Sequence, residues 1–177
     1  MKYIPNYVYK CIYDIDFDTL YESGKRIILS DLDNTIAPYD EKEPSVDTLK
    51  WNEELRKKGL KIYLVSNNND LRIKEFSKEF IIDGYLYHAK KPFIKKLTKF
   101  LKDKDIKKEE VISIGDQIVT DIIGFNKLGV DSILVKTINQ DNQKWYTKIN
   151  RLREKRILKK IKKVDYGKYN QIKELYE

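Results

Sequence analysis

The stretch that decides the fold is Arg26-Ile-Ile-Leu-Ser30, which leads directly into Asp31-Leu-Asp-Asn-Thr35. It is a short apolar run that ends in acidic, amide and hydroxyl side chains. The arrangement recurs twice, where 61–65 leads into Ser66-Asn-Asn68 and where 111–114 leads into Gly115-Asp-Gln117. Short apolar runs that alternate with helical stretches are typical of buried parallel strands in an α/β protein. Because ligands bind outside the carboxyl ends of such strands, we expect the functional site where these runs end.

The apolar runs predict a parallel sheet of five strands, at 26–30, 61–65, 85–87, 111–114 and 132–135. Residues 1–24 are interpreted as an N-terminal segment closed by Gly24, in which the alternating 14–18 forms an edge strand or a turn. Helices are expected between the strands, with Ser45 or Asp47 and then Asn69 or Asp70 as N-caps. Pro92 is placed in the first turn of a helix that runs to about Lys102.

Length and composition favour one domain over residues 1–177. The chain has 177 residues, of which 41% are hydrophobic, and it contains one cysteine and one histidine. A single cysteine excludes an internal disulfide, and a single histidine argues against a zinc site. No apolar run approaches the roughly 18 residues of a membrane span, and residues 1–25 do not resemble a signal peptide. These features predict a cytoplasmic protein in a reducing compartment.

The positive charge is concentrated in one segment. Residues 151–163 hold eight basic residues and one acid, so they carry +7 of the net charge of +8. The segment belongs to a predicted helix from Trp145 to about Val164, and we expect 145–177 to form a basic helical extension packed on the domain. Its apolar residues approximate one helical face: Ile149, Leu152, Ile157, Leu158, Ile161 and Val164. The basic block is either an interaction surface for an anionic partner or a solvated helix face.

The first strand end offers two carboxylates, Asp31 and Asp33, which a turn would bring to one cation. Magnesium prefers hard oxygen ligands and commonly combines one or two carboxylates with water and a substrate phosphate. A carboxylate can also attack phosphorus, and a neighbouring acid can protonate the leaving oxygen and then activate water. The alternative of a calcium-binding EF-hand loop fails, because its sixth and twelfth positions, counted from Asp31, are Ile36 and Lys42.

The later strand ends offer further groups for a phosphate and a cation. Ser66 could donate a hydrogen bond to a phosphoryl oxygen or cap a helix. Lys91, with Lys90 as the rival, could offset negative charge, and Asp116 is a suitable further anchor for magnesium. Asp121 could orient Lys91 or a metal-bound water, or cap the helix that follows.

Together these motifs resemble the haloacid dehalogenase (HAD) superfamily of aspartate-nucleophile phosphatases, of which the YqeG family in subclass IIIA is the nearest resemblance. The match runs through Asp31-Leu-Asp-Asn-Thr35, Val65-Ser-Asn-Asn68, Lys91-Pro92 and Gly115-Asp116 with Asp121. It extends to Pro5-Asn-Tyr-Val-Tyr-Lys10 at the N-terminus and to Asn150-Arg-Leu-Arg-Glu154 near the C-terminus, and so covers nearly the whole chain. Mitochondrial phosphatidylglycerophosphate phosphatases share this resemblance.

The resemblance implies a Rossmann-like three-layer sandwich and a magnesium-dependent phosphomonoester hydrolase. Asp31 would be the nucleophile and Asp33 the general acid and base. Magnesium would be held by Asp31, by the backbone carbonyl of Asp33 and by Asp116, while Ser66 and Lys91 would bind the phosphoryl group. Asn34, Thr35 and Asn67 are implied to contact substrate. One departure is that Asp121 lies five positions after Asp116, where many members space this pair by four.

Spacing constrains the substrate. The interval from Asp33 to Ser66 is 33 positions and that from Ser66 to Lys91 is 25, so neither has room for the cap domain that many HAD enzymes insert. We therefore expect an open site for a large substrate: a lipid headgroup, a phosphoprotein or a nucleic-acid end. The resemblance makes phosphatidylglycerophosphate the leading candidate, with the basic block 151–163 as a peripheral contact to the anionic inner surface of the membrane.

A binding protein without catalytic activity is the alternative. It would keep the fold and use the basic block to engage RNA, a ribosomal particle or a protein. The presence of both Asp31 and Asp33 favours the enzyme. RNA binding is less favoured because 151–163 contains no aromatic residue for stacking on bases.

Overall fold

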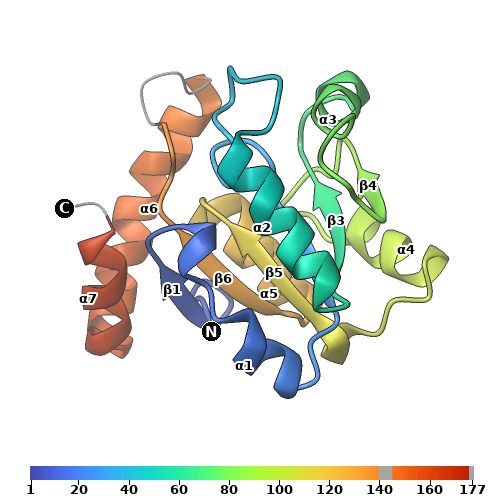
Figure 1. The fold of residues 1–177 in the computed structure, drawn as a ribbon. Helices are drawn as coiled ribbons and strands as arrows, with labels where there is room; N and C mark the ends of the chain where they lie inside the picture. Colours follow the sequence, from blue (N-terminus) through green and yellow to red (C-terminus); the bar gives the residue numbers. More distant parts are fainter. Residues whose placement is uncertain (140–144, 176–177) are drawn as a thin grey trace.

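The computed structural model describes residues 1–139 and 145–175, with the backbone alone for 145–151. Its centre is a parallel sheet with the strand order β1-β6-β5-β2-β3-β4 (Figure 1). The strands are β1 (Tyr7–Tyr9), β2 (Ile27–Ser30), β3 (Lys61–Val65), β4 (Gly84–Leu86), β5 (Val111–Gly115) and β6 (Asp131–Val135). The expectation of an α/β protein with a parallel sheet is confirmed, with six strands where five were predicted.

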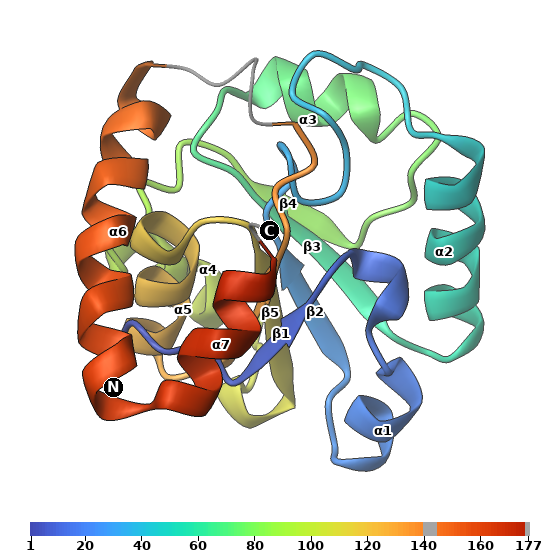
Figure 2. The same ribbon diagram turned by 90° about the vertical axis from the view of Figure 1, so that its left-hand side faces the viewer.

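Helices cover both faces of the sheet (Figure 2). The α-helices are α1 (Phe17–Glu22), α2 (Val46–Lys57), α3 (Asp70–Phe76), α4 (Lys95–Asp103), α5 (Ile123–Leu128), α6 (Trp145–Val164) and α7 (Tyr166–Glu174). Short 3-10 helices lie at η1 (Ile12–Asp14) and η2 (Lys108–Glu110), and a π-helix, η3 (Ile118–Ile122), precedes α5.

Side chains that alternate in direction along the strands form two separate hydrophobic cores, one on each face of the sheet. In β2, Ile28 packs with Trp51 and Leu55 of α2 and with Phe17 of α1 on one face. On the opposite face, Ile27 and Leu29 pack with residues of α4 and α5 such as Phe100 and Phe125. Successive side chains of a strand point to opposite faces, so an uninterrupted apolar run buries both sides of the sheet.

The additional strand, β1, comes from the N-terminal segment. Tyr7–Tyr9 pairs in parallel with Ile133–Val135 at the edge of the sheet. The sequence gives a weak signal because the strand has three residues, of which two are partly exposed tyrosines. The expectation for 14–18 was wrong in part: its residues form the end of η1 and the start of α1, where Asp16 caps the helix by accepting from the Thr19 N–H.

The helix predicted to begin at Pro92 also differs from expectation. Pro92 does not lie in its first turn, because α4 begins three residues later at Lys95. Ser45 and Asn69 do cap α2 and α3, through side-chain oxygens that accept from the N–H groups of Thr48 and Arg72.

Helices α6 and α7 pack on the β1 and β6 side of the molecule. Ile161 and Ile172 join Ile118, Ile122 and Leu134 in a third buried cluster. The predicted apolar face of α6 was wrong at Leu152 and Val164, which are 64% and 52% exposed, and the side chain of Ile149 lies outside the described residues.

The inward face of α6 instead follows Glu154, Ile157, Leu158 and Ile161. This is the i, i+3, i+4, i+7 spacing of one helix face, with a buried carboxylate at its first position. Within the described residues, no helix is long and apolar enough to cross a membrane.

Candidate active site

The candidate site lies at the centre of the sheet's carboxyl edge. Strand β2 lies between β3 and β5. From β2 the chain adds β3 and β4 on one side of the sheet, and it then adds β5 and β6 on the other side. Asp31, Ser66 and Asp116 therefore follow three adjacent strands, and the Asp31 N–H extends the ladder by donating to Ile114 O at 2.9 Å. This reversal point is where open parallel sheets form ligand crevices.

A buried ion-pair network lies at this edge of the sheet. The ammonium of Lys91 lies 2.7 Å from Asp31 Oδ1 and 2.8 Å from Asp121 Oδ1, with its side chain 1% exposed. It also donates to the carbonyl of Val65 at 2.7 Å. Burial disfavours the charged form of Lys91, but the carboxylates of Asp121 and Asp31 outweigh it and raise the pKa of Lys91 above its ordinary value. The rival residue, Lys90, is exposed.

Asp31 is a strongly perturbed carboxyl group. Burial raises the pKa of Asp31 to about 7; Lys91 opposes this shift, and the negative charges of Asp121 and Asp33 add to it. A carboxylate that is costly to ionise without a further cation is suited to ligate one, because the cation supplies the missing positive charge.

Asp116 faces Asp31 across the β2–β5 boundary. Thr137 Oγ1 donates to Asp116 Oδ2 at 2.8 Å, and Thr35 Oγ1 lies 3.3 Å from Asp31 Oδ2 and 3.5 Å from Asp116 Oδ1. Carboxylate oxygens of Asp31, Asp116 and Asp121 all lie within 4.8 Å of one another. A buried set of hard oxygen donors of this kind fits magnesium. The carboxylate of Asp121 belongs to this cluster, and that of Asp33 does not.

Gly115 makes this close arrangement of Asp116 and Asp121 sterically possible. A Cβ at Gly115 would lie 2.3 Å from Asp121 Cβ and 2.7 Å from its Oδ2, far inside van der Waals contact. The π-helix η3 returns Asp121 toward Asp116, and Asp121 Oδ2 accepts from the Gln117 N–H at 3.0 Å. Short π-helical turns are frequent at functional sites.

Helix α6 reaches this loop through Glu154. Glu154 is 3% exposed, and its carboxylate accepts from the Ile118 N–H at 2.7 Å. Ile118 is the first residue of η3, so this hydrogen bond holds the turn between Asp116 and Asp121. Without the Glu154 carboxylate, the buried Ile118 N–H would lose this acceptor.

Asp33 is held away from this cluster by groups from the β3–α3 region. Arg72 Nε donates to Asp33 Oδ1 at 3.0 Å, and Asn68 Nδ2 donates to Asp33 Oδ2. Arg72 Nη2 also donates to Pro38 O at 3.2 Å. The third guanidinium nitrogen, Nη1, is buried and has no acceptor among the described residues.

The remaining predicted site residues shape the loops. Asn67 ties two strand ends together, since its Oδ1 accepts from the Lys91 N–H at 2.7 Å and its Nδ2 donates to Lys91 O at 3.2 Å. Ser66 Oγ accepts from the Asn68 N–H at 3.0 Å, as a cap would. Asn34 has a φ of 64° and accepts from the Tyr39 N–H, which closes the loop after Asp33.

Sequence reasoning missed three site residues. Arg72 lies within a helix of mixed composition, and Thr137 follows a strand end that carries no acid. Glu154 was noted as part of a family pattern without a role, although one acid among eight bases was a usable signal.

Comparison with known proteins agrees with this geometry. A family model described as "Haloacid dehalogenase-like hydrolase" matches residues 34–135. The chain is also 35% identical over 161 residues to "Probable phosphatase YqeG" of Bacillus subtilis strain 168, which covers 91% of this chain and 92% of the relative. The chain belongs to the haloacid dehalogenase-like hydrolases. The resemblance to the YqeG family is thereby confirmed.

Solved structures support the same fold for this HAD-like chain. An uncharacterised protein from Listeria monocytogenes serotype 4b superposes with a TM-score of 0.54 at 19% identity, covering 67% of this chain and 84% of its own. A predicted HAD-like family hydrolase from Porphyromonas gingivalis reaches a TM-score of 0.50 at 14% identity, covering 73% and 98%. At these identities the likeness concerns the fold.

Proposed function

We propose that this HAD-like protein is a magnesium-dependent phosphomonoesterase that works through a phosphorylated Asp31. The observation that carries the proposal is the buried cluster of Asp31, Asp116 and Asp121 with Lys91 paired to two of them. The family membership and the relative described as a probable phosphatase point to the same chemistry.

The residues divide the reaction between them. An oxygen of Asp31 attacks phosphorus as the bond to the leaving oxygen breaks, and protonated Asp33 gives that oxygen its proton. Water then attacks the same phosphorus, Asp33 takes a proton from it, and Asp31 is released. Ser66 and Lys91 hold phosphoryl oxygens. Magnesium, held by Asp31, Asp116 and the Asp33 carbonyl, would neutralise charge on the phosphoryl group.

The site carries no separate cap. Residues 34–65 contain one loop, α2 and β3, and residues 67–90 contain α3 and β4, all of them described. A large substrate can therefore approach the carboxyl edge of the sheet. We propose a large phosphorylated substrate, with phosphatidylglycerophosphate as the first candidate and a membrane as its setting.

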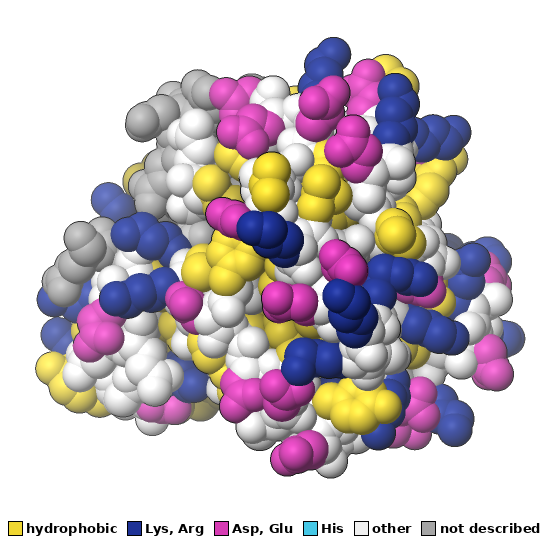
Figure 3. All heavy atoms as spheres, viewed as in Figure 1, with side chains coloured by type: hydrophobic (Ala, Val, Ile, Leu, Met, Phe, Trp, Pro, Cys, Tyr) yellow, Lys and Arg dark blue, Asp and Glu magenta, His cyan; other side chains and the backbone are white. Residues whose placement is uncertain are grey.

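Helix α6 supports the membrane setting. Its described basic side chains from Arg153 to Lys163 are exposed, so the block is a solvated surface available to anionic lipid. Figure 3 shows dark blue Lys and Arg side chains on the left, over α6 and α7, with some magenta Asp and Glu side chains among them, and both signs are also interspersed elsewhere on that face. A Lys or Arg close to an anionic surface contributes roughly 1 kcal/mol.

The test is turnover by wild type and Asp31→Asn, with Asp47→Asn, an exposed aspartate of α2, as the matched control. The panel contains p-nitrophenyl phosphate, phosphatidylglycerophosphate in micelles, a phosphopeptide, and oligonucleotides phosphorylated at either end. We expect magnesium-dependent release of phosphate that Asp31→Asn abolishes and Asp47→Asn preserves. Full activity in EDTA or in Asp31→Asn would contradict the proposal, and RNA binding without turnover of any substrate would favour the binding protein.

A further inference from the structure

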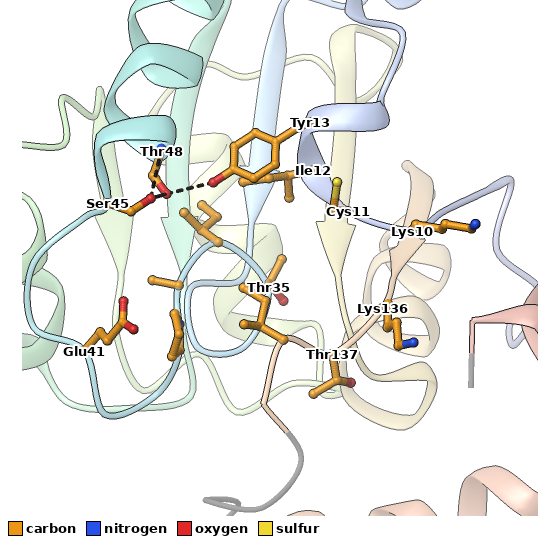
Figure 4. A pocket seen from close by; sticks show the side chains of 14 residues that line it. Lys10, Cys11, Ile12, Tyr13, Thr35, Glu41, Ser45, Thr48, Lys136 and Thr137 are labelled. Carbon is orange, nitrogen blue, oxygen red and sulfur yellow. Dashed lines mark hydrogen bonds between the residues drawn. The ribbon is translucent and has the colours of Figure 1, made fainter. Parts of the chain in front are cut away.

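The position of Asp33 indicates the side from which a leaving group would approach. Its carboxylate is held toward β3 and α3 by Arg72 and Asn68. The cavity of about 350 Å³ beside the loop after β2 lies on the other side, where the buried Thr35 and Thr137 separate it from the carboxylate cluster (Figure 4). With Asp33 as the proton donor, the leaving group lies toward the ends of β3 and β4 instead.

Residues 87–96 form the surface on that side, and we call them the lip. They lead from β4, the edge strand opposite β1, into α4 (Figure 1). The His88 N–H donates to Asn68 O at 2.9 Å, and the Asn68 side chain in turn bonds Asp33. Lys91, in the middle of the lip, extends its ammonium into the buried ion-pair network. The lip is therefore continuous with the reaction site.

The lip is strongly basic. Residues 84–102 contain six lysines and no acid. Apart from the buried Lys91, the lysines of the lip are exposed: Lys90, Lys95 and Lys96. The last two lie in the first turn of α4, which contains no acidic residue. Because cations are unfavourable at the positive end of a helix dipole, this basic turn is suited to a bound anion.

The lip also exposes aromatic rings. Phe93 is 73% exposed and Tyr87 46%, and the ring centroid of Tyr87 lies 5.5 Å from that of His88. Exposed rings interleaved with lysines are the platform on which unpaired bases stack, and the basic block of α6 has no such ring. The backbone is uncommon as well, since His88 and Lys90 have φ values of 45° and 59°. Non-glycine residues seldom adopt this region, and they do so most often at functional sites.

The loop on the other side of the α3 start has the opposite charge. Glu41 and Glu43 are exposed there, and Glu41 lines a pocket of about 260 Å³ together with Leu71 and Arg72. A flat anionic surface laid across the carboxyl edge would meet these acids as well as the lip. A single polyanionic chain can follow the lip alone, so the charges favour a strand as its partner.

We propose that the lip docks a single-stranded nucleic acid, whose terminal phosphate is a second kind of substrate for the Asp31 site. Bases stack on Phe93 and Tyr87, and the exposed lysines contact backbone phosphates. Asp31 attacks the terminal phosphorus, the bond to the sugar oxygen breaks, and Asp33 protonates that oxygen. Water then releases phosphate from Asp31 and returns a proton to Asp33. The inference rests on the proposed phosphatase function and extends its substrate class.

Binding is measured in Mg²⁺ with Asp31→Asn protein, which should not turn over, and a short fluorescent oligodeoxynucleotide phosphorylated at either end. We expect the single strand to bind about tenfold more tightly than the same strand annealed to its complement, because paired bases cannot stack on the lip. Adding Phe93→Ala should raise Kd about tenfold. Adding Lys90→Gln/Lys95→Gln/Lys96→Gln should lower the slope of log K against log salt by about 2.

The matched controls are Tyr166→Ala, an exposed ring of α7, and Lys159→Gln/Lys160→Gln/Lys163→Gln on α6. Both should keep the affinity and the preference for the single strand. Unchanged affinity in Phe93→Ala, or equal loss in the α6 variant, overturns the inference. It is also overturned if the lip substitutions weaken cosedimentation with anionic vesicles and not oligonucleotide binding, since the lip is then a membrane contact.

Turnover separates docking from catalysis. With Asp31 intact, kcat/KM for the oligonucleotide relative to that for p-nitrophenyl phosphate should fall about tenfold in Phe93→Ala, mainly through KM, and stay unchanged in Tyr166→Ala. Hydrolysis of p-nitrophenyl phosphate without release of the terminal phosphate overturns the second substrate but not the proposed function. Binding that depends on the lip in a protein that hydrolyses no phosphomonoester supports the docking surface and contradicts the proposed function.

Discussion

The carboxyl edge of the sheet and helix α6 both concentrate charged side chains, but the sheet edge buries them and the helix exposes them. Lys91 and Asp121 have side chains 1% and 2% exposed and bond each other, whereas Lys159, Lys160, Lys162 and Lys163 stand in water. Removing Lys91 would leave the buried carboxylates of Asp31 and Asp121 without their cation, which costs several kcal/mol, while a solvated lysine can be replaced at little cost. Charge in the sequence thus has meaning only once burial is known.

The largest effect should come from the two aspartates that follow β2 and β5. Asp116→Ala should remove a metal ligand, while Asp33→Asn should lower the rate by about 10²–10⁴-fold and retain magnesium binding better, because we place its carbonyl on the metal. Magnesium titration with parallel kinetics tests this. Equal loss of metal affinity in both variants would refute the division of roles.

Arg72 tests whether buried charge outside the carboxylate cluster also serves the reaction. Its replacement by Met should free Asp33 and lower kcat by about 10–100-fold, as loss of groups that orient active-site ligands commonly does. Arg72→Lys should recover part of the rate, and the pH profile of kcat should move in Arg72→Met. An exposed neighbour on α3, through Lys74→Met, is the control; unchanged kcat and pH profile in Arg72→Met would show a purely structural role.

Glu154 joins the two regions, since it belongs to the basic helix but is buried against η3. Glu154→Ala leaves the Ile118 N–H without its acceptor, at a cost of about 1–3 kcal/mol. We expect the magnesium concentration for half-maximal activity to rise roughly tenfold. Glu154→Gln should be milder because an amide oxygen still accepts. The control is Leu152→Ala, exposed on the same helix, which should leave the magnesium dependence unchanged. A Glu154→Ala variant with normal magnesium dependence would show that Glu154 does not support the metal site through η3.

The pH dependence of stability should also distinguish the regions. Because burial raises the pKa of Asp31 from 3.8 to about 7, the folded protein holds this proton more tightly than the unfolded chain. Without magnesium, stability should fall as pH rises from about 4 to 7. Asp31→Asn should then raise Tm by a few degrees at pH 8 and hardly at pH 4.

Thermal melts in EDTA across this pH range measure the effect. The matched control is Glu43→Gln, an exposed carboxyl in the loop before α2, whose Tm should follow that of wild type. An Asp31→Asn variant less stable than wild type at pH 8 would contradict the assigned direction.

The smallest effect on the fold should come from the basic helix. Lys159, Lys160, Lys162 and Lys163 replaced by Gln should leave Tm and turnover of p-nitrophenyl phosphate nearly unchanged. Cosedimentation with anionic vesicles at low salt should weaken, by roughly 1 kcal/mol per lysine that contacts lipid. If wild type ignores anionic vesicles at low salt, the exposed lysines have no membrane role.

The sequence determined the parallel α/β fold and the placement of Asp31, Ser66 and Asp116 at strand ends. Uninterrupted apolar runs, each followed by a few polar residues, are local signals that can be found along the chain. Only the tertiary structure decided that Lys91 rather than Lys90 meets Asp31, that Arg72 and Asn68 hold Asp33, and that Glu154 reaches Ile118. The tertiary structure also revealed β1, whose three residues form a strand because they pair with β6. These features depend on contacts between residues 35 or more positions apart, or on which face of a turn a side chain takes, and neither leaves a periodic trace along the chain.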